Sequence, residues 1–325
     1  MKITNLYPDS QTLVREVSNF LAEWNNNESF IWANTSGSTG QPKKVKLKKS
    51  SMLASAKMTG AFFGLKKNQN ALLVLSPTYI AGKMMIVRAM HHGMNLYLGQ
   101  VSSVPFKKLS VHIHFSAMIP TQVKELIRNN VSFDKIEHLI IGGAQIGYDL
   151  KSSLHDVSTK CYATFGMTET LSHIALAEID ENELMYECLP GVSVRSDEKG
   201  SMIIDAPNLL DSELKTNDII EINEDGRFVW KGRTDFVINS GGIKLHPEEI
   251  ENKLAPFIQS TFFISSESHA KFGEVAVLYI ESSTPINLDT VFESLKKVER
   301  PKSVYYRNHF SYTASGKLNR LKSIE

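Results

Sequence analysis

Apolar and polar positions follow two different periods along the chain, and the changes of period predict its elements. Residues 9–24 carry apolar side chains at helical spacing, Leu13, Val17 and Phe20 among them, which predicts an amphipathic helix. Residues 71–75 form a continuous apolar run, which is typical of a buried strand. The first region of the chain therefore mixes both periods.

This mixture continues as an alternation up to about residue 174. Helices are predicted at 50–63, 84–92, 120–129 and 149–155, and strands at 30–33, 95–98, 112–116, 138–141 and 160–164. Strands that alternate with helices indicate α/β layers around a largely parallel sheet.

The pattern changes after residue 174 and again near residue 235. Short strands predicted at 192–195, 201–205, 219–223 and 227–231 indicate a small antiparallel β region. Further on, helices are predicted at 247–254 and 288–298, and strands at 260–265 and 274–281. We therefore predict two domains, an α/β domain with a small β region over 1–234 and a compact α+β domain over 235–325.

Composition narrows the class of protein. The 325 residues are 42% hydrophobic and 22% charged, and the formal net charge is +1. This balance favours neither nucleic acid nor an anionic membrane as a partner. The two cysteines, Cys161 and Cys188, make no disulfide framework. With no signal-like start and no apolar run long enough for a bilayer, we expect a soluble cytoplasmic protein. Its oligomeric state is left open, with a homodimer among the alternatives.

The segment 35–43 follows a predicted strand and contains small hydroxyl residues, glycines and a lysine. Its candidate anion-binding residues are Thr35, Ser36, Gly37, Ser38, Thr39, Gly40 and Lys43. Glycines let backbone N–H groups approach an anion, and hydroxyls and a lysine add donors and charge. The spacing is not that of a Walker loop. Composition alone would suit a solvated surface loop equally well.

The string itself resembles the phosphate loop of the adenylate-forming superfamily, which includes acyl-CoA synthetases, peptide-synthetase adenylation domains and luciferases. Further segments resemble the family's other motifs in the same order. They are Gly142-Gly143-Ala144, Phe165-Gly166-Met167-Thr168-Glu169, Asp218, Gly232-Arg233-Thr234-Asp235, and 313–320 with Lys317. The resemblance spans nearly the whole chain and implies the adenylate-forming fold. It also implies an N-terminally shortened chain, because only 34 residues precede Thr35.

The resemblance implies roles for the motif residues. Thr168 would contact the α-phosphate of ATP, and Glu169 would bind Mg²⁺, a cation that prefers oxygen ligands. The adenine would lie against Gly142, Gly143, Ala144, Phe165 and Gly166, with Phe165 standing where the family usually has Tyr. Asp218 and Arg233 would hold the ribose, and Asn217 replaces the family's usual Gly before this Asp.

The remaining motif residues imply a two-step enzyme with a mobile C-terminal domain. Lys317 would be the adenylation lysine, Asp235 the hinge, and Gly241 and Gly242 the loop that faces the thiol in the second step. The implied activity is that of an ATP-dependent acid–thiol ligase, which forms an acyl-adenylate and transfers the acyl group to coenzyme A.

The acid is indicated by the segment 76–88 and by His173. With the compact chain, these residues resemble most the o-succinylbenzoate–CoA ligases of menaquinone synthesis. That acid has a second carboxylate, so a cation is expected in its pocket. The candidates are Tyr79, Lys83, Arg88 and His173, although both cations could lie on a helix surface and His173 could be structural.

Three alternatives to this function stay open at this point. One is another acyl or aryl acid–CoA ligase, and the second is an adenylation enzyme that loads a carrier protein. The third is a non-catalytic nucleotide-binding homologue, against which the presence of Glu169, Asp218, Arg233 and Lys317 argues. His112 and His114 share a strand face, but without a third ligand nearby they do not favour zinc.

Overall fold

The computed structural model describes residues 1–34, 44–180, 183–288, 290–312 and 318–324. The phosphate loop Thr35–Lys43 and the lysine Lys317 lie outside these residues, so their predicted roles stay predictions. Among the described residues, no helix combines the length and apolar character needed to cross a bilayer.

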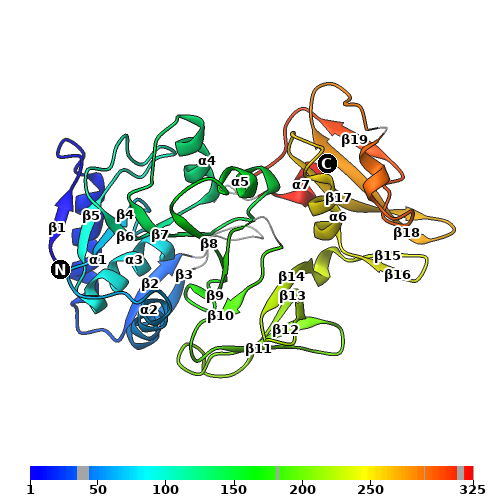
Figure 1. The fold of residues 1–325 in the computed structure, drawn as a ribbon. Coiled ribbons are helices and arrows are strands. Elements are labelled where there is room, and N and C mark those ends of the chain that lie inside the picture. The colour runs from blue at the N-terminus through cyan, green and yellow to red at the C-terminus, as the bar shows by residue number, and fades with distance from the viewer. Residues whose placement is uncertain (35–43, 181–182, 289, 313–317, 325) are drawn as a thin grey trace.

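An eight-stranded sheet forms the centre of the N-terminal part, in the order β1-β5-β4-β6-β7-β8-β9-β10 (Figure 1). The first six strands of this order run parallel, β9 runs antiparallel to β8, and β10 runs antiparallel to β9. The bounds are β1 Ile3–Asn5, β4 Asn70–Leu73, β5 Asn95–Leu98, β6 Ile113–Met118, β7 Ile136–Ile141, β8 Lys160–Gly166, β9 His173–Glu178 and β10 Glu187–Cys188.

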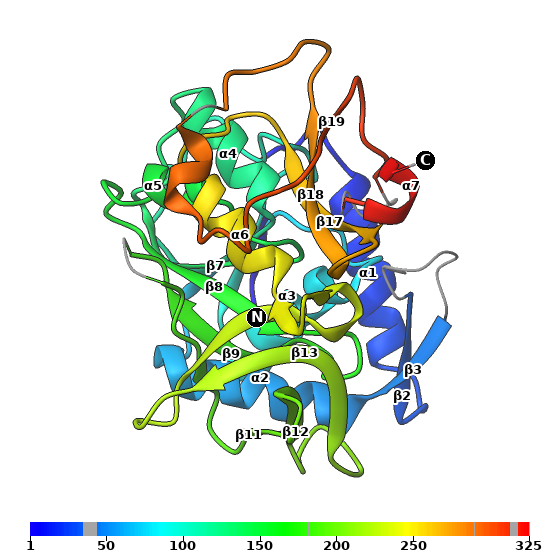
Figure 2. The same ribbon diagram turned by 90° about the vertical axis from the view of Figure 1, so that its right-hand side faces the viewer.

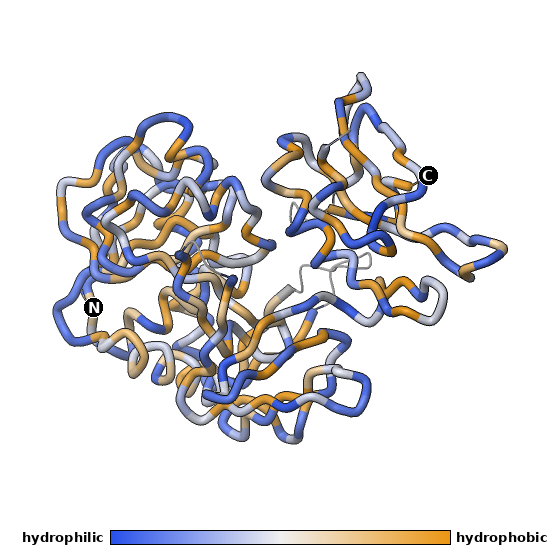
Figure 3. The backbone as a smooth tube through the Cα atoms, turned by 45° about the vertical axis from the view of Figure 1, so that its right-hand side comes forward, coloured by the Kyte–Doolittle hydropathy of each residue, from blue (hydrophilic) through white to orange (hydrophobic). Residues whose placement is uncertain are grey.

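Helices cover both faces of this sheet. The neighbours Leu72 and Leu73 on β4 belong to two different cores, because successive side chains of a strand point to opposite faces. One core contains residues of α1 (Thr12–Trp24), α2 (Lys49–Phe63) and α3 (Ile80–His92), and the other contains residues of α4 (Pro120–Arg128) and α5 (Tyr148–Ser153). Figure 3 shows apolar stretches concentrated along the interior strands. The predicted α/β layers are therefore present.

A four-stranded antiparallel sheet follows, in the order β11-β12-β13-β14. The bounds are β11 Ser193–Ser196, β12 Ser201–Asp205, β13 Leu214–Ile222 and β14 Phe228–Arg233. A separate hairpin of β2 (Phe30–Asn34) and β3 (Lys44–Lys48) brackets the segment 35–43.

The C-terminal part is built on a five-stranded sheet, in the order β16-β15-β18-β17 with β19 beside β18 (Figure 2). Its elements are η1 Thr234–Phe236, β15 Ile238–Ser240, β16 Ile243–Leu245, α6 Pro247–Leu254, β17 Phe262–His269, β18 Gly273–Glu281, η2 Val291–Ser294, β19 Val304–Arg307 and α7 Arg320–Ile324. Asp235 lies in η1, between the last strand of one sheet and the first of the next.

Two predictions are wrong. The small β region was predicted to begin after about residue 174, but the strand β9 at 173–178 pairs with β8 and so belongs to the large sheet. The helix predicted at 288–298 is only the short 3-10 turn η2. It ends because buried Leu295 adopts extended backbone angles and the Glu299 carboxylate accepts the N–H of Lys296 at 3.0 Å. Local side-chain hydrogen bonds of this kind compete with a helix.

Candidate nucleotide and acid site

Two glycine segments stand at the carboxyl ends of β7 and β8, which are neighbours in the parallel sheet. A side chain at Gly142 would place its Cβ 2.0 Å from the hydroxyl of Thr164, and Gly143 has φ +89°. Both positions therefore require glycine. Gly143 and Ala144 are exposed, so their backbone is open to a flat ligand, and the adenine contact stays a prediction.

The loop between β8 and β9 is folded around Thr170. The buried Thr170 hydroxyl accepts the N–H of Met167 at 3.0 Å and lies 2.8 Å from the carbonyl oxygen of Ser172. Thr168 is half-buried and Glu169 is exposed in the same turn. A rigid turn with an exposed carboxylate suits a Mg²⁺ that arrives with a nucleotide, since Mg²⁺ prefers oxygen ligands and retains several waters.

Asp218 and Arg233 face each other on neighbouring strands β13 and β14. The Asp218 carboxylate is 7% exposed and accepts the indole N–H of Trp230 at 2.9 Å. Burial raises the pKa of Asp218, although this hydrogen bond and the charge of Arg233 oppose the shift. Arg233 lies 3.7 Å from Asp218 and donates to Asp235 at 2.8 Å. The candidate ribose pair therefore touches the predicted hinge residue.

Phe165 and the glycine loop of the C-terminal part are differently exposed. Phe165 is half-buried and packs edge-on against Phe228, with ring centroids 5.3 Å apart. Gly241 and Gly242 form the turn between β15 and β16 with φ +59° and +84°, and the neighbouring Ile243 is 51% exposed. The turn thus presents an apolar, exposed tip, and its predicted place in the thiol step stays a prediction.

The candidate acid-pocket residues have three different surroundings. Tyr79 is exposed at the start of α3. The Lys83 ammonium lies 3.3 Å from the Glu23 carboxylate and above the ring of Phe20, so its charge is already paired. Arg88 and His173 are buried side by side. The alternative that both cations lie on a helix surface is therefore wrong.

Arg88 is 2% exposed and is held by neutral groups. Its guanidinium donates to the hydroxyl of Ser172 at 2.8 Å and to that of Thr59 at 3.3 Å, and it lies 3.5 Å from Nδ1 of His173. Within the described part of the chain it has no carboxylate partner. Burial lowers the pKa of Arg88 to about 9, and burial together with the Arg88 charge holds the pKa of His173 well below its usual value.

Sequence reasoning missed Thr59, Ser172 and Trp230, which hold the candidate site residues. Ser172 is adjacent to His173 and was within reach of the motif analysis. Thr59 sits in a helix with no distinguishing pattern, and Trp230 is one of several aromatic residues in strands. Only the packing of distant elements shows their contacts.

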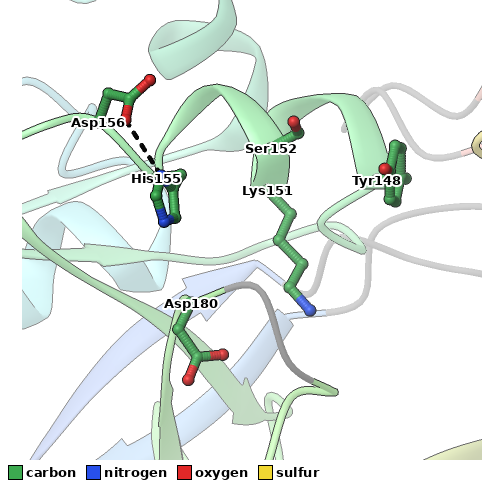
Figure 4. A pocket seen from close by; sticks show the side chains of 6 residues that line it. All are labelled: Tyr148, Lys151, Ser152, His155, Asp156 and Asp180. Carbon is green, nitrogen blue, oxygen red and sulfur yellow. Dashed lines mark hydrogen bonds and ion pairs between the residues drawn. The ribbon is translucent and has the colours of Figure 1, made fainter.

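Two other clusters of polar side chains contain none of the described candidate site residues. A cavity of about 440 Å³ is lined by Tyr148, Lys151, Ser152, His155, Asp156 and Asp180 (Figure 4). It has mixed charge, and none of the predicted site residues that the structure describes lines it.

The other cluster corrects the expectation that His112 and His114 have no third ligand nearby. Glu137 supplies one, and the three ligand atoms lie within 4.8 Å of one another. The backbone N–H of Asn70 donates to Nδ1 of His114 at 3.1 Å. The proton of the neutral ring is therefore on Nε2, so this ring offers a cation no free lone pair without losing that bond.

The cysteines are unsuited to nucleophilic chemistry. Burial raises the pKa of Cys161 to about 12 and that of Cys188 to about 11, so both stay protonated thiols at neutral pH. The thiolate is the reactive form of cysteine. A cysteine nucleophile is therefore not expected, and the chemistry of the site must come from side chains that bind and position the reactants.

Comparison with known proteins identifies the family. The family model described as AMP-binding enzyme matches residues 11–198, more than half of the chain. The chain belongs to the AMP-binding enzyme family. The match contains the segment 35–43 and the motif 165–170. The resemblance seen in the motifs is thereby confirmed.

Curated relatives agree with the family match. The chain is 26% identical to the 2-succinylbenzoate–CoA ligase of Staphylococcus epidermidis, over 89% of this chain and 68% of that protein. It is 24% identical to the same enzyme of Lactococcus lactis, over 88% of this chain and 69% of that protein. The chain thus spans about two thirds of the length of these relatives.

Solved structures share the fold. A Dyadobacter fermentans protein, described as AMP-forming acyl-CoA synthetase or AMP-acid ligase II-like, is 31% identical with a TM-score of 0.67 and covers 96% of this chain and 94% of its own. The Bacillus subtilis o-succinylbenzoate coenzyme A synthetase, solved with ATP and magnesium, is 19% identical with a TM-score of 0.75 over 90% of this chain and 69% of its own. The predicted fold and the enzyme class, an AMP-forming acid–CoA ligase, are confirmed.

Proposed function

We propose that this enzyme activates 2-succinylbenzoate with ATP and transfers the acyl group to coenzyme A. Its curated relatives carry the name of this activity. The observation that carries the proposal is Arg88, a buried cation without a carboxylate partner among the described residues. An unpaired buried charge is costly, and the second carboxylate of a dicarboxylic acid would compensate it.

The surroundings of Arg88 suit an anion. Nη1 of its guanidinium has only the weak thioether acceptor of Met85 at 3.9 Å within the described chain. Ser55 and Thr59 are four residues apart on α2 and so share a helix face. The Ser55 hydroxyl oxygen is buried without a hydrogen-bond partner in the described residues. Unused N–H groups on a buried cation are what a carboxylate binds.

The chemistry follows from placing two negatively charged reactants together. A carboxylate oxygen attacks the α-phosphorus of ATP, and pyrophosphate leaves with its electron pair, so a mixed anhydride forms. Thr168 and the segment 35–43 would hold phosphate oxygens, and Lys317 would bridge the carboxylate and the α-phosphate. Glu169 would hold the Mg²⁺ that arrives with ATP, and the cation would supply charge neutralisation. The barrier is lowered by positioning and electrostatic stabilisation.

The second half-reaction needs no nucleophile from the enzyme. The thiol of coenzyme A gives up its proton to solvent, its sulfur attacks the acyl carbon, the acyl–phosphate bond breaks, and AMP leaves with the bonding electron pair. The exposed turn at Gly241 and Gly242 is the element proposed to face the thiol. Residues 235–325 would move about Asp235 between the two steps, since hinging of a domain is an established switching mode.

An assay with a matched pair of variants tests the proposal. Pyrophosphate release is measured with ATP, Mg²⁺, coenzyme A and either 2-succinylbenzoate or benzoate. We expect the wild type to use the dicarboxylate, and Arg88→Met to raise its KM by about 10- to 100-fold, because hydrogen bonds to charged groups contribute about 1.5–3 kcal/mol. The KM for ATP should not change.

Lys83→Met is the control on the same helix. Its ammonium is already paired with Glu23, so this variant should keep the preference for the dicarboxylate even if it is less stable. An enzyme that used benzoate as well as 2-succinylbenzoate, or an Arg88→Met variant with an unchanged preference, would contradict the proposal. Product formation only on a carrier protein would assign the second step to a different thiol.

A further inference from the structure

The hydroxyl of Thr59 determines the protonation of its neighbours. Its oxygen lies 3.1 Å from the backbone carbonyl oxygen of Ser55, one turn earlier on α2. A carbonyl only accepts, so the single hydrogen of Thr59 is used there. The same oxygen then accepts from Nε of Arg88 at 3.3 Å and must also accept from Nε2 of His173 at 3.2 Å.

The tautomer of His173 follows from this count. Nε2 carries the proton, which leaves Nδ1 as an acceptor in the neutral ring. Nδ1 lies 3.3 Å from the hydroxyl of Ser172 and 3.5 Å from Nη2 of Arg88. Ser172 accepts from Arg88 at 2.8 Å, so its own hydrogen is free to point at Nδ1. Each of these contacts therefore pairs a donor with an acceptor.

Protonation of His173 would break the arrangement. A second N–H would point at the Ser172 hydroxyl and at the guanidinium, and two cations would be buried together. The charged group that faces His173 within the described residues is Arg88, and the other neighbours, from α2 and the loop before β9, are hydroxyls. Burial and this charge both lower the pKa of His173. The ring is therefore neutral at working pH.

The contacts also determine which edge of Arg88 is available. Nε and Nη2 are held by Thr59, Ser172 and His173, from three separate elements. Nη1 is left with the thioether of Met85. A guanidinium fixed along one edge presents the other in a single orientation, and preorganisation of this kind reduces the entropic cost of binding.

We propose that His173, locked as the neutral Nε2–H tautomer between Thr59 and Arg88, is a positioning residue that fixes the guanidinium for the second carboxylate of the acid. The proposal rests on the proposed function for its ligand. His173 acts through Arg88 in it and does not itself touch the acid, which replaces the expectation that its ring hydrogen-bonds the substrate.

A double-mutant cycle measures whether His173 acts through Arg88. The variants are His173→Leu, Arg88→Met and their combination, with His173→Gln as the conservative form whose amide N–H can still donate to Thr59. We expect His173→Leu to raise the KM for 2-succinylbenzoate about 10-fold, as for one lost hydrogen bond to a charged group, with kcat and the KM for ATP unchanged. His173→Gln should restore most of the loss.

The cycle has a decisive outcome. In the Arg88→Met background, His173→Leu should have no further effect on the KM for the acid. Additive effects of the two substitutions would overturn the proposal, because independent sites add and coupled ones do not. Equal losses for acid and ATP would indicate a merely structural histidine and would overturn it as well.

A second measurement does not depend on the acid. The ¹⁵N resonances of the His173 ring in the intact protein should report a neutral, Nε2-protonated tautomer between about pH 5.5 and 8, where an unperturbed histidine titrates. Thr59→Val should change that signal. An imidazolium or an Nδ1–H tautomer would overturn the inference. If the wild type ignores 2-succinylbenzoate but the tautomer is as expected, only the proposed function fails.

Discussion

Two buried charged side chains are held in opposite ways. Asp218 has an indole N–H at 2.9 Å and the cation of Arg233 at 3.7 Å, so its charge is compensated before any ligand binds. Arg88 has neutral partners alone within the described chain. A compensated carboxylate suits uncharged ribose hydroxyls, whereas an uncompensated cation suits an anion.

The role of Asp218 is tested by Asp218→Asn. The amide keeps an acceptor for Trp230 but loses one for the ribose, so we expect the Kd for ATP to rise about 10- to 100-fold, as for a lost hydrogen bond to a charged group. Unfolding should change little. Calorimetry with ATP measures the effect, and Asp225→Asn, in an exposed turn, is the control.

The same residue predicts a pH dependence of ATP binding. Burial raises the pKa of Asp218, so the carboxylate takes up a proton at a higher pH than an ordinary aspartate, whose pKa is about 3.9. Affinity for ATP should therefore fall on acidification before that value is reached, and the fall should be absent in Asp218→Asn. An identical profile in both proteins would contradict the assignment.

At the scale of elements, the alternation of strand and helix was predictable, because the side chains that face the core recur with the period of the helix or strand that carries them. The glycine motifs at the carboxyl ends of β7 and β8 were also readable from the sequence, because glycine marks places where a ligand can approach the backbone closely. The edge strand β1 and the short strands β15 and β16 were missed, since three residues carry no readable period. The network around Arg88 was unpredictable because α2, α3 and β9 meet only in the folded chain.

Arg320 of α7 links this helix to α6 in the C-terminal part. We therefore expect it to contribute to stability. It contacts Glu251 of α6 at 2.8 Å and lies 3.6 Å from Glu248, and both carboxylates are largely buried. Arg320→Met would leave them without this partner, so we expect a loss of about 3–5 kcal/mol in the free energy of unfolding. Chemical denaturation measures it.

The loss should depend on pH in a defined direction. Burial raises the pKa of Glu248 and raises that of Glu251 to about 7. A carboxyl with a raised folded-state pKa favours folding below its unfolded pKa, near 4.5, and loses that contribution as pH rises through the folded value. The destabilisation by Arg320→Met should therefore shrink as pH falls through about 7, where Glu251 takes up a proton, since protonated carboxyls need no cation. Lys322→Met, exposed on α7, should show neither effect.

At the scale of the whole molecule, the proposed function requires one site to serve two half-reactions. The candidate ribose pair Asp218 and Arg233 adjoins Asp235, and Asn217 donates to Asp235 at 3.0 Å. The residues proposed to bind the nucleotide are thus in direct contact with the proposed hinge residue. We propose that the C-terminal part presents Lys317 in one orientation and the turn at Gly242 in the other.

Two substitutions separate these orientations. Lys317→Ala should abolish pyrophosphate release from ATP and acid but still convert supplied acyl-adenylate to the thioester with coenzyme A. Gly242→Val should do the reverse. A Cβ at Gly242 meets nothing within 4 Å, yet φ +84° strains any other residue, so its effect stays in the exposed turn. Both half-reactions are followed separately by pyrophosphate release and thioester formation. If each variant lost both half-reactions to the same extent, a single fixed orientation would serve both steps and the alternation of the C-terminal part would be wrong.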